Sequence, residues 1–158
     1  MALQDRNTRK LYTANTREKT GSDLVDKVDE LLEQVKQDTG ENVREINADS
    51  EGGFRSAGFQ KMLGERNTIL RFKQRTREGL SGTAQLDSAI GTWKNTLKKL
   101  RGGSSKWWKY ADLATDRKNK LSHSGLDGNT PDQAMGGDTS GVMEFRRQEK
   151  AADTLEET

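Results

Sequence analysis

The amino-acid sequence predicts an elongated all-α fold, made of a helical hairpin or short coiled-coil segments with glycine-rich breaks and partly disordered termini. Apolar residues recur at helical spacing in two segments, whereas no segment shows the sustained apolar and polar alternation typical of strands. Leu, Ile, Val and Phe account for 27 of the 158 residues, or 17%, below the roughly 20% that usually supports a packed core. We therefore expect three or four helices that order chiefly on a partner or in an oligomer.

The first helical register is an apolar stripe within the acidic segment 22–53. Ser22 stands before an acidic first turn and is the predicted N-cap. Gly40 is the predicted C-cap, because glycine readily adopts the left-handed conformation that ends helices. Steps of 4, 3 and 4 residues place the stripe on one helix face, and its members are Leu24, Val28, Leu31 and Val35.

The second helical register is ended by Gly102 and Gly103. Each register lasts only about two heptads, which suits a helical hairpin, a small bundle or a packing strip on another protein. The members of this second stripe are Leu86, Ile90, Trp93, Leu97 and Leu100. Both stripes are predicted to pack on helices of a partner.

Two further helices are expected beside these stripes. One runs over about 56–78, with Phe59, Leu63 and Leu70 on one face. The other runs over 106–121 with Ser105 as its cap.

The C-terminal part is predicted to hold a linker and a tail. Residues 122–141 contain five glycines and the proline of the chain, which predicts a glycine-rich linker. Within the linker, Thr130 and Gln133 form a capping-box pattern around Pro131, before a helix of about one turn. Residues 142–158 form an acidic C-terminal tail that is either a short amphipathic helix or disordered.

The net charge of +2 conceals a strong separation of charge along the chain. The N-terminal arm 1–21 carries +3 and the segment 22–53 carries −7. The segment 54–121 carries +11, and residues 122–158 carry −5. A block of +11 can serve an anionic partner such as nucleic acid, or it can pair with the acidic helix of the same chain.

Two clusters within the basic segment are the candidate polyanion-binding residues. The first lies within the expected helix 56–78, and the second ends the helix that carries the second stripe and brackets two tryptophans. Cations in a last helical turn also complement the helix dipole, so part of this pattern is ordinary helix chemistry. The candidates are Arg71, Lys73, Arg75, Arg77, Lys98, Lys99, Arg101, Lys106 and Lys109.

Trp107, Trp108 and Tyr110 form an aromatic cluster directly after a Gly and Ser linker. On a helix, Trp108 projects about 100 degrees away from Trp107, so one narrow seam cannot hold both indoles. The cluster is therefore a predicted docking anchor for another subunit. The alternatives are a cap on the second stripe, base stacking on a nucleic acid and contact with a membrane surface.

Searches for catalytic and metal-binding patterns find nothing that predicts a reaction. The chain has no cysteine and one histidine, His123, in a loop of small polar residues. No nucleotide-binding glycine motif is present. The sequence therefore predicts no enzyme activity, no cofactor and no metal site.

The predicted function is a non-enzymatic structural or assembly subunit of a homo- or hetero-oligomeric complex, with an RNA- or DNA-binding module as the alternative. In composition the chain is similar to small cysteine-free helical components of virions and phages. No apolar run is long enough for a transmembrane span or a signal peptide. We expect a soluble protein, cytoplasmic or within a virion or other assembly, with peripheral attachment to an anionic membrane as a third possibility.

Overall fold

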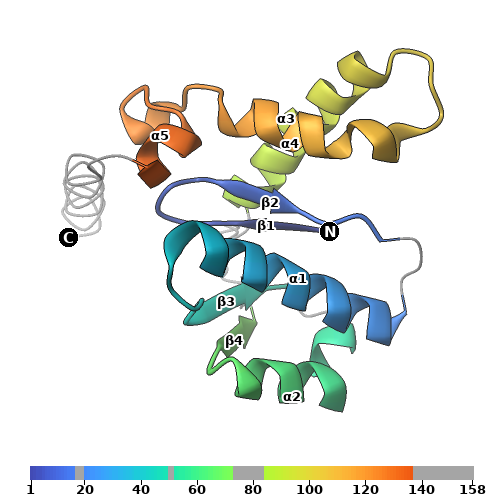
Figure 1. The fold of residues 1–158 in the computed structure, drawn as a ribbon, viewed down its shortest axis with the longest axis vertical. Coiled ribbons are helices and arrows are strands. Elements are labelled where there is room, and N and C mark those ends of the chain that lie inside the picture. The colour runs from blue at the N-terminus through green and yellow to red at the C-terminus, as the bar shows by residue number, and fades with distance from the viewer. Residues whose placement is uncertain (17–19, 50–51, 73–83, 137–158) are drawn as a thin grey trace, which may run out of the picture.

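The computed structural model describes residues 1–16, 20–49, 52–72 and 84–136, and their fold is mixed α/β (Figure 1). Strands β1 (Ala2–Gln4) and β2 (Leu11–Thr13) form one two-stranded sheet, and β3 (Glu45–Ala48) and β4 (Ile69–Phe72) form another. The all-α prediction is therefore wrong. Strands of three or four residues are too short for a recognisable alternation, because each contributes only one or two inward side chains.

The hairpin of β1 and β2 is antiparallel, with Leu3 opposite Tyr12. The Asp5 carboxylate shapes the turn by accepting hydrogen bonds from the backbone N–H groups of Asn7 (2.8 Å) and Thr8 (2.7 Å). Arg9 completes the turn in the left-handed conformation, with φ of 61°. The N-terminal arm thus contains a buried strand, since Leu11 and Tyr12 both lie in the core.

Helix α1 (Gly21–Thr39) lies between the hairpin and helix α2 (Ala57–Glu65) (Figure 1). Its N-cap is Thr20, whose hydroxyl accepts from the Asp23 N–H, so the prediction of Ser22 as cap is wrong by two residues. The predicted C-cap is confirmed, because Gly40 has φ of 74° and its N–H donates to the Lys36 carbonyl. The apolar side of α1 contributes to two adjacent core clusters, one with α2 and one with β2.

Strands β3 and β4 are parallel, and the 3₁₀ turn η1 (Gly52–Arg55) and α2 lie between them in the sequence. Ser56, where the predicted helix was expected to begin, is the N-cap of α2. The predicted helix over 56–78 is nevertheless wrong, because α2 ends at Glu65 and Asn67 takes the left-handed conformation with φ of 53°. Leu63 and Leu70 reach the same core cluster, one from a helix and one from a strand, so their spacing of seven residues imitates a helical face.

Helix α3 (Ala84–Arg101) packs on helix α4 (Ala111–Asn119), and the 3₁₀ turn η2 (Trp107–Tyr110) connects to α4 directly. The predicted break after α3 is confirmed at Gly102, with φ of 54°. The predicted helix over 106–121 begins instead as η2, and no side chain caps it. Thr115 joins three elements, since its hydroxyl accepts from the Trp93 indole N–H (2.9 Å) and lies 2.6 Å from the Thr13 hydroxyl.

The segment 122–136 is folded in the structure as the 3₁₀ turn η3 (Ser124–Leu126) and helix α5 (Pro131–Gly136). The predicted capping box is confirmed, because the Gln133 N–H donates to the Thr130 hydroxyl and the Thr130 N–H donates to the Gln133 side chain. Leu126 and Ala134 form a small buried cluster beneath this turn. The tail predicted over 142–158 lies outside the described residues.

Candidate nucleic-acid interface

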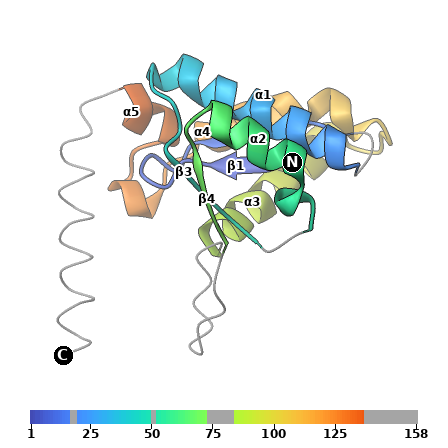
Figure 2. The same ribbon diagram turned by 90° about the horizontal axis from the view of Figure 1, so that it is seen from below.

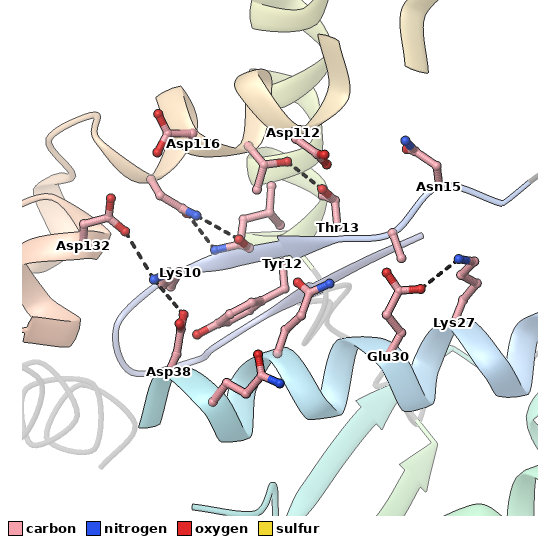
Figure 3. A pocket seen from close by; sticks show the side chains of 16 residues that line it. Lys10, Tyr12, Thr13, Asn15, Lys27, Glu30, Asp38, Asp112, Asp116 and Asp132 are labelled. Atoms are coloured by element: carbon pink, nitrogen blue, oxygen red, sulfur yellow. Dashed lines mark hydrogen bonds and ion pairs between the residues drawn. The ribbon is translucent and has the colours of Figure 1, made fainter. Parts of the chain in front are cut away.

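A polar groove of about 680 Å³ lies between β2, α1 and α4 (Figure 3). Lys10 bridges two elements at one end, with its Nζ 2.7 Å from Asp38 and 3.5 Å from Asp132. The groove also contains Lys27, which pairs with Glu30 at 2.8 Å. Its two lysines are outnumbered by five carboxylates, which are Glu30, Asp38, Asp112, Asp116 and Asp132.

Tyr12 lies at the floor of the polar groove and is buried, being only 4% exposed. Burial raises the pKa of its phenol, and the nearby Asp38 carboxylate raises that pKa further. No hydrogen-bond partner satisfies the Tyr12 hydroxyl among the described residues. Excess negative charge around a neutral phenol disfavours a phosphate backbone, so the polar groove is unsuited to nucleic acid.

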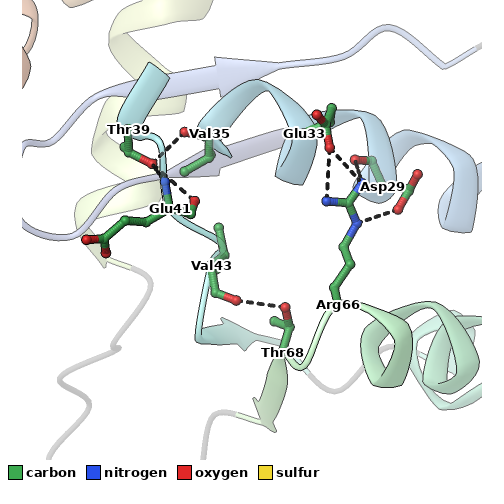
Figure 4. A network of polar contacts seen from close by, with 8 residues as sticks. All are labelled: Asp29, Glu33, Val35, Thr39, Glu41, Val43, Arg66 and Thr68. Carbon is green, nitrogen blue, oxygen red and sulfur yellow. Dashed lines mark hydrogen bonds and ion pairs between the residues drawn. The ribbon is translucent and has the colours of Figure 1, made fainter. Parts of the chain in front are cut away.

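Part of the basic segment is neutralised within the chain, as one of the two sequence interpretations predicts. The Arg66 Nε donates to Asp29 at 2.6 Å, and both Nη atoms reach Glu33 at 3.3 Å (Figure 4). The hydrogen bond to Asp29 is the main cause that raises the pKa of Arg66. Arg71 pairs with Glu45 across the β3–β4 sheet at 2.9 Å. These two arginines link the acidic segment to the basic one.

A second group of cations lies in the C-terminal half of α3 and around η2, and we name this surface the basic–aromatic face. Among the described residues, no carboxylate forms an ion pair with its lysines. Trp107 and Trp108 are 39% and 51% exposed and contact each other edge to face, with ring centroids 6.4 Å apart. The face consists of Lys94, Lys98, Lys99, Arg101, Lys106, Trp107, Trp108 and Lys109.

The helical registers explain how this face is built. Lys94, Lys98 and Arg101 follow one stripe of α3 at spacings of four and three residues, which places their cations on one side of the helix. Lys106 and Lys109 flank the tryptophans on the following turn. Lys94 is the member that the sequence argument left out of its candidates, although it lies one helical turn before Lys98.

An apolar cleft of about 380 Å³ adjoins the basic–aromatic face, between the hairpin, α3 and η2. Trp107 and Lys94 belong to both the face and the cleft. Its apolar lining comes from Met1, Ala2, Leu11, Ala14, Ile90, Trp93, Leu97 and Trp107.

The two apolar stripes predicted to pack on a partner lie mainly against the chain's own elements. Val28, Leu31 and Val35 are buried in the two core clusters, and Leu24 is half-buried beside one of them. On α3, Leu97 is buried, while Leu86, Ile90, Trp93 and Leu100 are half-buried. Intramolecular packing therefore accounts for the spacing of the α1 stripe, and α3 keeps a partly open apolar side.

The other candidate residues are distributed over several elements. Tyr110 is half-buried at the start of α4, while Arg71 lies on β4, away from the basic–aromatic face (Figure 1). Lys73, Arg75 and Arg77 lie outside the described residues. Five of the candidates lie at the end of α3 and at η2, and they are Lys98, Lys99, Arg101, Lys106 and Lys109.

No protein-family model and no curated protein match the sequence. The fold, however, is similar to that of several solved structures. A chain of the simian T-cell lymphotropic virus intasome, solved with PP2A regulatory subunit B56 gamma, is similar with a TM-score of 0.70 at 15% identity. That likeness covers 86% of this chain and 47% of the other, so this chain spans about half its length.

Two catalytic core domains are similar over most of both chains. The HTLV-2 integrase catalytic core domain in complex with magnesium, in its dimeric form, matches with a TM-score of 0.63 and 18% identity, covering 84% of this chain and 80% of that one. The BIV integrase catalytic core domain matches with a TM-score of 0.64 and 15% identity, covering 94% and 88%. At these identities the likeness establishes the fold, which is that of retroviral integrase catalytic cores.

This fold overturns the predicted function. The expectation of a non-enzymatic structural subunit is wrong, because the similar structures are enzyme domains. The expectation of no enzyme activity, which rested on the absence of catalytic motifs, is contradicted by the same likeness to catalytic core domains. The comparisons also lend no support to a coiled coil or to a virion component, and α1 and α3 pack chiefly on α2 and α4 respectively.

The magnesium in the HTLV-2 structure raises the question of a metal site in this chain. Within the described ranges, no three His, Cys, Asp or Glu side chains come close enough together to hold a metal ion. The described residues therefore do not fit a three-ligand site, and no catalytic step follows through a metal. Of the helices described, none has both the length and the apolar character needed to cross a membrane.

Proposed function

We propose that this chain is a nucleic-acid-binding domain with an integrase-like fold, and that it holds phosphates on the basic–aromatic face. The observation that carries the proposal is the lysine group of α3 and η2, which lies beside two exposed indoles and is not paired with described carboxylates. Its structural neighbours are integrase catalytic core domains, and this gives the proposal its enzyme-related context.

The charges of the polar groove and the apolar cleft support the basic–aromatic face as the surface that binds phosphates. Carboxylates exceed lysines in the polar groove by five to two, whereas Lys94 is the one charged side chain among the described residues that line the apolar cleft. A cation that contacts a phosphate releases condensed counterions, and each contact adds roughly 0.9 to the slope of log affinity against log salt concentration. Five lysines and one arginine on the basic–aromatic face can therefore produce strong, salt-dependent binding.

The proposal predicts that removal of two face cations weakens binding in a salt-dependent way. The double variant Lys98→Ala with Lys99→Ala should bind a labelled DNA oligonucleotide more weakly and lower the salt slope by up to about two, because at most two phosphate contacts are lost. Fluorescence anisotropy at several salt concentrations measures both quantities.

Lys61→Ala is the matched control, because Lys61 is also exposed on a helix but lies on α2, where it approaches Glu65 at 4.0 Å. The control should leave affinity and slope unchanged. Binding that does not depend on salt in the full chain, or equal losses in the control and the double variant, would contradict the proposal.

A further inference from the structure

The apolar cleft has the form of a small ligand site rather than of a packing defect. Its volume of about 380 Å³ falls within the range of roughly 300 to 1,000 Å³ that is usual for ligand pockets. Two indoles, those of Trp93 and Trp107, belong to its lining, and aliphatic side chains of the hairpin and α3 complete it. An aromatic and aliphatic lining with few polar groups suits a flat, partly apolar ligand.

Some polar side chains in the cleft form hydrogen bonds within the protein, and others are exposed and can contact a ligand. The Trp93 indole N–H donates to Thr115, and the Thr13 hydroxyl also contacts Thr115, so both are engaged inside the fold. Asn15 and Lys94 line the cleft and are exposed. An amide offers both a donor and an acceptor, which can pair with the edge of a nucleobase.

Charge complementarity distinguishes this cleft from a purely apolar docking site. Lys94 lines the cleft, and Lys98 and Arg101 continue from it along the same stripe of α3. The part of a ligand that extends from the cleft along α3 therefore lies near these cations. An apolar peptide or lipid tail would gain nothing from this row, whereas a nucleotide strand has phosphates to place there.

We propose that the apolar cleft receives one unstacked base of a single-stranded nucleic acid, with Trp107 as the stacking platform at its mouth. This inference rests on the proposed nucleic-acid binding and adds the form of the ligand. Phosphates next to the inserted base lie along Lys94, Lys98 and Arg101, and the Asn15 amide contacts the edge of the base. The cleft thereby prefers a strand with accessible bases over a duplex.

The test compares two probes that carry the same phosphates and differ in their bases. The full chain is titrated with an oligothymidylate and with an abasic oligomer of the same length at fixed salt concentration. We expect the oligothymidylate to bind at least about 5-fold more tightly, the lower end of what base–aromatic stacking supplies. It should also quench tryptophan fluorescence, whereas the abasic oligomer should not.

Adjacent tryptophans provide a matched pair of variants, because Trp107 lines the cleft and Trp108 does not. Trp107→Ala should remove most of the preference for bases, while Trp108→Ala should keep it. Ile90→Trp fills the cleft from α3 and should have the effect of Trp107→Ala without removing an indole. Circular dichroism verifies that each variant is folded. If either Trp107→Ala or Ile90→Trp fails to fold, the other variant still tests whether the cleft binds a base.

The outcomes separate this inference from the proposed function. Equal, salt-dependent affinity for both probes overturns the cleft inference and leaves the proposed function standing. Absence of salt-dependent binding by either probe overturns both. Equal losses in Trp107→Ala and Trp108→Ala place the stacking outside the cleft and overturn the inference. An apolar dye that occupies the cleft and is not displaced by the oligothymidylate points to an apolar ligand and overturns it too.

Discussion

Asn119, the last residue of α4, is joined to strand β2 of the N-terminal hairpin through its side chain. Its Oδ1 accepts from the Leu11 N–H at 2.8 Å, and its Nδ2 donates to the Leu11 carbonyl at 2.9 Å. The residue is 5% exposed and lies 108 positions away from Leu11. It completes the backbone pairing of β2, so that α4 holds the open edge of the hairpin.

Replacement of Asn119 by Ala should lower the free energy of unfolding by about 2 to 4 kcal/mol, because it leaves a buried N–H and a buried carbonyl without partners at about 1 to 3 kcal/mol each. Urea denaturation followed by circular dichroism measures the change. Asn47→Ala is the control, since Asn47 is exposed on β3, and it should alter stability by less than about 0.5 kcal/mol. A similar small change in both variants would refute the role given to Asn119.

At the scale of elements, local chemistry sets where helices start and stop. Gly40, Gly102 and the box of Thr130 with Gln133 all occupy the capping positions predicted for them. Each of these signals involves residues within four positions of one another, so the neighbouring sequence is sufficient to specify it. The predicted caps Ser22 and Ser105 are exceptions, because Thr20 lies two residues before Ser22 and offers the same hydroxyl, and no side chain caps η2.

Substitution by alanine should change stability in opposite directions at Gly40, which caps a helix, and at Gly64, which lies inside one. Gly40→Ala should destabilise the protein by about 1 to 2 kcal/mol, because φ of 74° is strained for a residue with a Cβ. Gly64→Ala lies inside α2 with no atom within 4 Å of the new methyl group. That substitution should stabilise by about 0.5 to 1 kcal/mol through helix propensity. Thermal denaturation of both variants decides, and a stabilising Gly40→Ala would contradict the account.

At the scale of the whole molecule, the separated charges fold onto one another only in part. Arg66 and Arg71 bind carboxylates of the acidic segment, whereas the lysines of α3 and η2 form no ion pair with described carboxylates. The hairpin lies between α1 and the α3–α4 pair (Figure 1). Figure 2 views the same layers from below, along the direction in which they stack. The hairpin therefore connects the two halves of the described fold.

This position predicts that the N-terminal strands are needed for cooperative folding. Deletion of residues 1–14 removes both strands and the core residues Leu11, Tyr12 and Ala14. Unfolding of the shortened chain in urea should be broad, with a smaller dependence of free energy on denaturant than in the full chain, because less surface is buried. A sharp transition with an unchanged slope would contradict this role and would restore the view of residues 1–21 as a low-contact arm.

Neither the strands nor the apolar cleft could be predicted from the pattern of residues within one stretch of sequence. Leu70 repeats the helical spacing of Leu63, and only the left-handed Asn67 between them shows that the chain leaves the helix. The cations of Lys98 to Lys109 were recognisable because they are close in sequence. The cleft beside them was not, since it joins Met1 and Ala14 to Ile90 and Trp107. No pattern within one segment reports such a contact.

The sequence by itself determined the helix ends, the apolar stripe of α1 and the separation of charge, because each depends on residues near one another in the chain. Only the tertiary structure decided that the fold is α/β and that the α1 stripe packs within the chain. It also decided that two indoles, an apolar cleft and lysines that form no ion pair with described carboxylates lie together. The physical reason is that burial and pairing between distant segments outweigh local preference when strands are short and apolar residues are few.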